Sequence, residues 1–162
     1  MAEPEDSSRH MLRHAVATLA YRGGKALRGA PEAFANFQAS STTRTPRAIL
    51  AHLGDLLEWA LSQAQGAERW RPVAPADWEA GVERFFRSLE AFDAHLASGE
   101  PLRTSAEKLF QGPVADALTH VGQLALLRRM AGAPVRGENY AVADITIGRV
   151  GRDQAASRRE FE

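Results

Sequence analysis

The sequence predicts an all-α protein, an up-and-down four-helix bundle with a short extra helical segment and an extended C-terminal tail. Its 162 residues, 44% of them hydrophobic, suit a single domain with one core. Four segments place apolar residues at the spacing of an amphipathic helix, and no internal repeat or low-complexity block interrupts them. We therefore expect one domain over residues 1–162, with the bundle at about 7–132 and the tail at 133–162.

The first helix is expected to begin at Ser7 or Ser8, because either hydroxyl can cap it, and to run to about Arg28. Its apolar residues recur every three or four positions. Residues 31–44 contain two phenylalanines followed by a cluster of serines and threonines. This composition favours a short turn of helix and then a loop.

The second and third helices have clear starts in the sequence. Thr45 and Pro46 are typical of an N-cap and a first helical position, so a helix is expected from there to Gly66. Residues 69–77 then contain two prolines and end in an aspartate that can cap a helix, which indicates a connector. The third helix is expected over about 77–98.

The last helical segments precede a tail of mixed character. Residues 104–110 can form one or two turns, and Gly112 and Pro113 are expected to open a fourth long helix that ends at Gly132. Beyond it, the only β-like run is 142–150. We expect the tail to be an extended chain laid over the bundle.

Composition excludes several classes of function. Twenty Lys and Arg balance twenty Asp and Glu, so no bulk charge attracts nucleic acid or an anionic membrane. The absence of cysteine excludes disulfides, thiolate metal sites and a cysteine nucleophile. No apolar run approaches the length of a membrane span, and the N-terminus has acids where a signal peptide has bases. The expectation is a cytoplasmic protein with neither a nucleic-acid nor a membrane partner.

Two histidines stand at inward-facing helical positions. His120 points in the direction of apolar residues of the fourth helix, and Asp116 lies one turn earlier on the same stripe. His52 is placed in the same way on the second helix. Two imidazole nitrogens and one carboxylate oxygen from facing helices make a three-ligand metal site with open positions, which Zn, Ni or Fe(II) would fit.

Other interpretations of these side chains remain open. The same three residues can form a hydrogen-bonded polar cluster in the core. His10 and His14 have the spacing of a metal pair, but their position near a terminus favours a solvated pair. In the metal hypothesis, Gln123 could orient a ligand and Asp55 could accept the free N–H of His52.

The motif THVGQLALLRRMAG at residues 119–132 resembles the last bundle helix of the DinB/YfiT-like superfamily of metal-dependent four-helix-bundle proteins. Residues 46–58, PRAILAHLGDLLE, resemble the second helix of that family with its inward histidine. The resemblance covers roughly residues 7–132 and leaves the tail outside. It implies a DinB/YfiT-like bundle and, as members are frequently dimers, a homodimer.

In that superfamily a divalent metal, often Zn or Ni, is held by one histidine of the second helix and a His-x-x-x-His pair of the last. His52 and His120 match these positions by motif. Asp116 stands where many members have histidine, and the thiol-dependent isomerase branch similarly has an acidic residue. The resemblance thus implies a divalent-metal cofactor on His52, Asp116 and His120.

Two functions are therefore expected as alternatives. The first is a divalent-metal-binding protein that acts as a metal-dependent thiol transferase or hydrolase on a small molecule, with a low-molecular-weight thiol as a further cofactor. The second is a non-enzymatic, dimeric helical bundle with a degenerate metal site or a small-molecule pocket. Fold alone does not decide between them.

Overall fold

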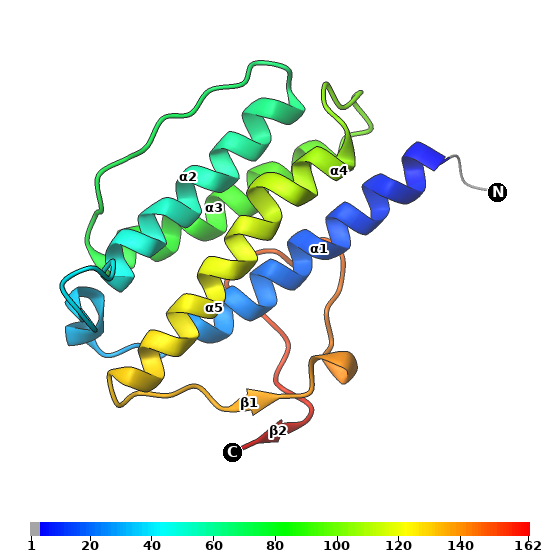
Figure 1. Cartoon of the computed structure of the whole chain (residues 1–162). Helices are drawn as coiled ribbons and strands as arrows, with labels where there is room; N and C mark the ends of the chain where they lie inside the picture. The colour runs from blue at the N-terminus through cyan, green and yellow to red at the C-terminus, as the bar shows by residue number, and fades with distance from the viewer. Residues whose placement is uncertain (1–3) are drawn as a thin grey trace.

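The computed structural model describes residues 4–162, which form a mostly helical fold (Figure 1). The helices are α1 (Pro4–Leu27), α2 (Pro46–Ala64), α3 (Trp78–Ala97), the short α4 (Ala106–Leu109) and α5 (Ala115–Met130). A 3-10 turn at Glu32–Asn36 follows α1, and another at Tyr140–Val142 lies in the tail. The only strands of the described chain are β1 (Gly137–Glu138) and β2 (Glu160–Phe161).

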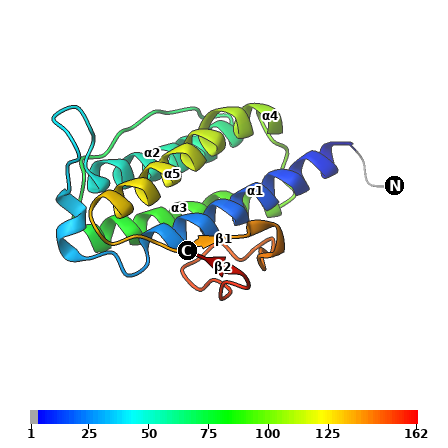
Figure 2. The same ribbon diagram turned by 60° about the horizontal axis from the view of Figure 1, so that its bottom comes forward.

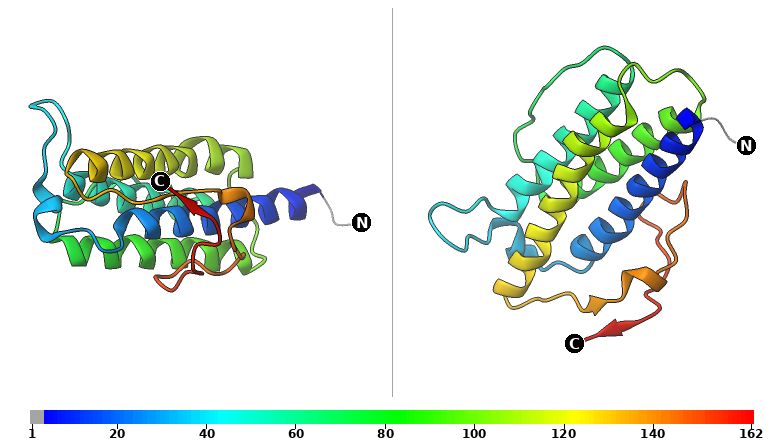
Figure 3. Two further views of the ribbon diagram at one scale, coloured as in Figure 1. Left: turned by 90° about the horizontal axis from the view of Figure 1, so that it is seen from below. Right: turned by 45° about the vertical axis from the view of Figure 1, so that its right-hand side comes forward.

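The expected up-and-down order is wrong. Helix α1 packs against α3 and α5, and α2 packs against the same two helices, so α1 and α2 occupy opposite corners of the bundle. Figure 1 and both views of Figure 3 show that α2 and α3 run in the same direction, antiparallel to α1 and α5. The bundle therefore contains one parallel pair of consecutive helices.

A crossover loop, residues 65–77, makes this order possible. It leaves the end of α2 and returns along the outside of the bundle to the level at which α2 began (Figure 1). Helix α2 has 19 residues and is about 28 Å long at 1.5 Å per residue. Thirteen residues can span about 43 Å when extended, so the loop covers this distance with slack. The length of this connector is the feature of the sequence that indicates a parallel α2 and α3.

The predicted starts of α2 and α3 are confirmed. Helix α1 instead begins at Pro4, so Ser7 and Ser8 lie inside the helix and do not cap it as the sequence predicted. The Thr45 side chain accepts a hydrogen bond from the backbone N–H of Ala48, with Pro46 in the first turn. Asp77 caps α3 in the same way through the N–H of Ala80, at 2.9 Å. The apolar face of α3 is buried throughout. Its members are Val82, Phe85, Phe86, Leu89, Phe92 and Leu96.

The sequence predicted that Gly112 and Pro113 open a helix, and this is wrong. Helix α4 starts six residues before Gly112, at Ala106, where the Ser105 side chain accepts from the N–H of Lys108. It continues without a break into α5 through a π turn at Phe110–Val114. Proline lacks an N–H and its ring collides with the preceding turn of a regular α-helix. The wider π turn accommodates both defects inside one continuous helix.

The tail crosses the side of the bundle formed by α1 and α3 (Figure 2), which confirms an extended chain laid over the helices. The β-like run at 142–150 forms no strand, and the two strands of the described chain pair as Gly137 with Phe161 and Glu138 with Glu160. The buried Glu138 carboxylate binds α1, accepting from the Tyr21 hydroxyl at 2.6 Å and the Lys25 ammonium at 2.7 Å. This clip ties the tail to the first helix.

Arg128 is buried and closes the C-terminal end of α1. Its guanidinium donates to the carbonyl oxygens of Ala26 and Arg28, both at 3.0 Å, and to that of Ala133 at 2.7 Å. These are groups that a helix end and a following turn leave without intrahelical partners. Among the described residues, no helix combines the length and the apolarity needed to cross a bilayer.

Candidate metal centre

The three residues singled out in the sequence meet at the seam between α2 and α5. His52 comes from α2, while Asp116 and His120 come from successive turns of α5. One potential ligand atom from each lies within 4.8 Å of the other two. Their side chains are 21%, 45% and 12% exposed, respectively. The cluster therefore lies at the rim of the core, where ions can enter, and does not face the core interior as the helical periodicity predicted.

Asp116 lies between the two imidazoles. Its Oδ2 is 3.5 Å from His52 Nε2, and its Oδ1 is 3.2 Å from His120 Nδ1. The two rings are 4.6 Å apart between centroids. This set of two nitrogens and one carboxylate oxygen could hold a divalent ion, because it matches the donors that first-row transition metals take in proteins.

A backbone hydrogen bond fixes the tautomer of His120. Its Nδ1 lies 2.8 Å from the main-chain carbonyl oxygen of Asp116, one turn earlier. A carbonyl oxygen can only accept, so Nδ1 carries the proton and a neutral ring keeps its lone pair on Nε2. A metal-binding imidazole commonly donates its other N–H in this way to a carbonyl or carboxylate. The ring of His120 is thus prepared as a nitrogen ligand.

Electrostatics also favour the neutral form of His52. Burial lowers the pKa of His52 from its ordinary value of 6.5, and the neighbouring His120 lowers it further, while Asp116 opposes both effects. A lower pKa leaves the imidazole unprotonated near neutral pH. Metal binding requires this form, since a protonated ring has no lone pair to give.

The π turn determines the direction of the two candidate ligands of α5. It ends at Val114, so Asp116 and His120 are the second and sixth residues of the helix after it. A residue added to a helical turn rotates everything after it by about 100° relative to an uninterrupted α-helix. The direction in which Asp116 and His120 face α2 therefore depends on this turn.

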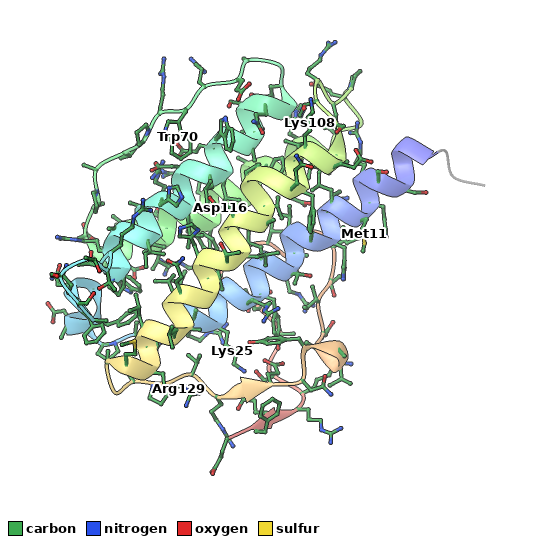
Figure 4. All side chains as sticks on the ribbon, in the orientation of Figure 1. Met11, Lys25, Trp70, Lys108, Asp116 and Arg129 are labelled. Carbon is green, nitrogen blue, oxygen red and sulfur yellow. The ribbon has the colours of Figure 1, made fainter. Side chains whose placement is uncertain are left out.

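A surface cavity of about 520 Å³ opens beside the cluster. Two of the candidate ligands, His52 and Asp116, contribute to its wall. The rest of the lining comprises Leu56, Trp59, Glu68 and Trp70. Figure 4 labels Trp70 on the crossover loop and Asp116 on α5. The Trp70 indole meets the His52 ring edge to face at 5.8 Å between centroids.

Sequence reasoning missed the cavity wall. Trp59, Glu68 and Trp70 lie outside every site that the sequence predicted. Their only local signal is that the connector after α2 contains an acid and a tryptophan, Glu68 and Trp70, and is too long for a simple turn. The loop brings Trp70 onto Trp59, with ring centroids 5.7 Å apart and planes at 82°.

The suggested supporting residues do not support the cluster. Asp55 is buried and accepts from Arg84 and from the backbone N–H of Val73, so its expected bond to His52 is wrong. Gln123 is exposed on α5. His10 and His14 are exposed on α1, which agrees with a solvated pair.

Comparisons with known proteins give no match: no protein-family model, no curated protein and no solved structure matches this chain. The functional argument therefore rests on the site itself. The fold and the residues at the α2–α5 seam define a mostly helical protein with a candidate centre of two histidines and one aspartate.

Proposed function

We propose that the protein binds a divalent cation, zinc or nickel, through His52, Asp116 and His120. The observation that supports this most is the bond from His120 Nδ1 to the Asp116 carbonyl, which leaves Nε2 of that ring free to bind metal. The grouping of all three potential ligand atoms within 4.8 Å supports it too. The proposal places the chain among DinB/YfiT-like proteins, in line with the motifs at residues 46–58 and 119–132.

Three protein ligands leave coordination positions free, and two of these ligands line the cavity. A bound cation would supply Lewis acidity, lowering the pKa of a water or thiol that reaches it from the cavity. The chain's own contribution is positional. The backbone carbonyl of Asp116 holds the His120 ring, and Trp70 covers one edge of His52.

The chemistry proposed for this arrangement is thiol transfer or hydrolysis on a small molecule, with a low-molecular-weight thiol as cosubstrate in the first case. A cavity of about 520 Å³ has the volume of a small-molecule site. We further propose that the chain acts as a homodimer, as the family resemblance implies.

A non-enzymatic protein is the second candidate. The short distances from Asp116 to both imidazoles, 3.2 and 3.5 Å, are also those of a carboxylate that holds two histidines together without a metal. In this candidate the cluster stabilises the α2–α5 seam, and the cavity binds a small molecule without converting it.

Elemental analysis separates the two. The protein is purified without an affinity tag, stripped with a chelator, incubated with Zn or Ni and desalted. We expect about one ion per chain in the parent, little in His120→Ala and Asp116→Ala, and the parental value in His14→Ala, which removes an exposed histidine of α1. An unchanged content in both site variants, or no ion in the parent, would overturn the metalloprotein proposal.

A further inference from the structure

The cavity beside the metal ligands has two indole walls. Trp59 is half-buried on α2, and Trp70 is 46% exposed on the crossover loop. Their rings are nearly perpendicular, with centroids 5.7 Å apart. A corner of two indoles offers electron-rich faces in more than one direction. Such faces attract organic cations, most strongly when they belong to tryptophan.

A carboxylate completes this corner. Glu68 Oε1 accepts from Trp59 Nε1 at 3.1 Å and from the side-chain amide of Gln63 at 3.2 Å. Both donors are neutral, so they orient the carboxylate without cancelling its charge. Among residues 4–162, no Lys, Arg or His nitrogen forms an ion pair with Glu68, although 11 such pairs exist elsewhere. The negative charge of the exposed Glu68 side chain is thus held at the cavity, with no ion-pair partner among the described residues.

The loop that carries Glu68 and Trp70 is anchored on both sides of the tryptophan. The backbone N–H of Arg69 donates to the Ser62 hydroxyl at 3.0 Å, and the N–H of Val73 donates to the Asp55 carboxylate at 3.1 Å. Asp55 is itself held by Arg84 at 2.8 Å. These bonds fix the loop at the level of the cavity, so the indole corner exists before any ligand arrives.

The lining contains no side chain that would favour an anion. Its charged members are the carboxylates of Glu68 and Asp116, and the others are His52, Leu56 and the two tryptophans. A cation bound at the candidate ligands would leave the Glu68 carboxylate of the cavity wall negative.

We propose that this cavity binds a small organic cation, an alkylammonium head that lies against Trp59 and Trp70 and pairs with Glu68. As a statement about the substrate of the metal site, this inference rests on the proposed function. The binding itself requires only the two indoles and the carboxylate. The rest of the ligand then extends from Glu68 toward His52 and Asp116, where the reacting group would lie.

Choline and its uncharged isostere 3,3-dimethylbutan-1-ol test the proposal, because they share one shape and differ in charge. Each is titrated by calorimetry into the chelator-treated protein and into the zinc-loaded protein. We expect choline to bind at least about tenfold more tightly than the alcohol in both forms, with quenching of tryptophan fluorescence. Three outcomes would overturn the proposal. They are equal binding of the two probes, tighter binding of acetate than of either probe, and no binding of either probe at a concentration above ~10 mM and about 50 times that of the protein.

Variants locate the binding. Glu68→Gln keeps the size of the side chain and is expected to weaken choline about tenfold, leaving the alcohol unchanged. Trp70→Leu should weaken choline by a similar factor. Glu83→Gln removes the same charge from an exposed position of α3 and should change neither affinity. If Glu68→Gln and Glu83→Gln behave alike, the cation lies elsewhere and the proposal fails.

The two proposals fail separately. Choline binding to a chain that retains no zinc would sink the metal proposal and leave the cation site standing as a pocket of the non-enzymatic protein. Zinc retention without any preference for choline would leave the metal centre standing and overturn this inference.

Discussion

His120 donates from Nδ1 to the main-chain carbonyl of Asp116, while the side chain of the same Asp116 lies between His120 and His52. One residue therefore has two separate roles: its backbone orients an imidazole and its carboxylate is a candidate ligand. Substitutions of the side chain leave the backbone role intact. Substitutions at position 116 can therefore test the carboxylate separately from the backbone carbonyl.

Asp116→Asn removes the charged ligand and retains the carbonyl that holds His120. We expect the affinity for zinc to fall at least about tenfold, with the free energy of unfolding of the metal-free protein nearly unchanged. A competition titration with a chromophoric chelator measures the affinity. Thr119→Ala is the control, because the Thr119 hydroxyl also donates to that carbonyl and is not a ligand. Equal losses in the two variants would contradict the assignment.

The pKa of His52 should lie below 6.5 in the metal-free protein, because burial and the adjacent His120 disfavour its charged form. The imidazolium competes with the metal, so zinc affinity should change little as pH falls from 8 to about 6.5 and decrease below it. An NMR titration of the ring protons, assigned with His52→Asn, measures the midpoint. A midpoint above 6.5 would refute the expectation.

Two helical glycines should respond oppositely to alanine. A Cβ at Gly23 would lie 2.7 Å from the Phe85 ring, so Gly23→Ala forces α1 and α3 apart and should destabilise the fold by about 1–3 kcal/mol. Gly122, on α5, has open space around it, and Gly122→Ala should stabilise by about 0.5–1 kcal/mol. Urea denaturation measures both. Stabilisation by both variants would mean that α1 and α3 are not this close at Gly23, and destabilisation by both would mean that Gly122 is not in open space.

The Arg84 guanidinium neutralises the charge of the buried Asp55 carboxylate, with Nη2 of Arg84 2.8 Å from Oδ1 of Asp55. Arg84→Met leaves that charge with only a backbone donor and should cost about 3 kcal/mol of stability. The double variant Arg84→Met with Asp55→Leu should recover most of the loss, because it removes the unpaired charge as well. Arg87→Met, at an exposed position of α3, should stay within about 0.5 kcal/mol of the parent. Thermal unfolding of the set tests the pairing.

Acid should open the tail clip. Burial by itself raises the pKa of Glu138, but hydrogen bonds from Lys25 and Tyr21 outweigh it, and the net pKa lies below the ordinary 4.5. A depressed folded-state pKa stabilises the fold above pH 4.5, and this contribution is lost as pH falls through the lower folded value. The protection of the β1 and β2 amides from hydrogen exchange, measured relative to their intrinsic exchange rate at each pH, should therefore decrease below about pH 4.5. Glu138→Gln should show fast exchange already at pH 7, and a pH-independent difference between the two proteins would count against the clip.

The sequence predicted the local features of this chain well. Thr45 and Asp77 cap the helices that they were expected to cap, because capping depends on a few neighbouring residues. Helical period places His52 on α2 and His120 on α5 on the sides that meet at the seam, and the structure brings them together with Asp116 at the rim of the core, not in its interior.

What the sequence did not predict depends on contacts between distant residues. The bond from Lys25 to Glu138 joins positions 113 residues apart, and no periodicity encodes it. The parallel run of α2 and α3 depends on the path of residues 65–77, which local composition marked only as a connector. The contact of Trp70 with His52 follows from that path and was missed for the same reason.

The crossover loop also limits how this protein can change. A path back along about 28 Å of α2 requires at least about nine residues, so roughly four of the loop's thirteen can be deleted before α3 must reverse its direction. The fold therefore requires the loop segment that forms the wall of the cavity. Its length is constrained by the fold while its side chains are free to vary, so ligand preference can diverge by substitution at positions such as 68 and 70 without any rearrangement of the bundle.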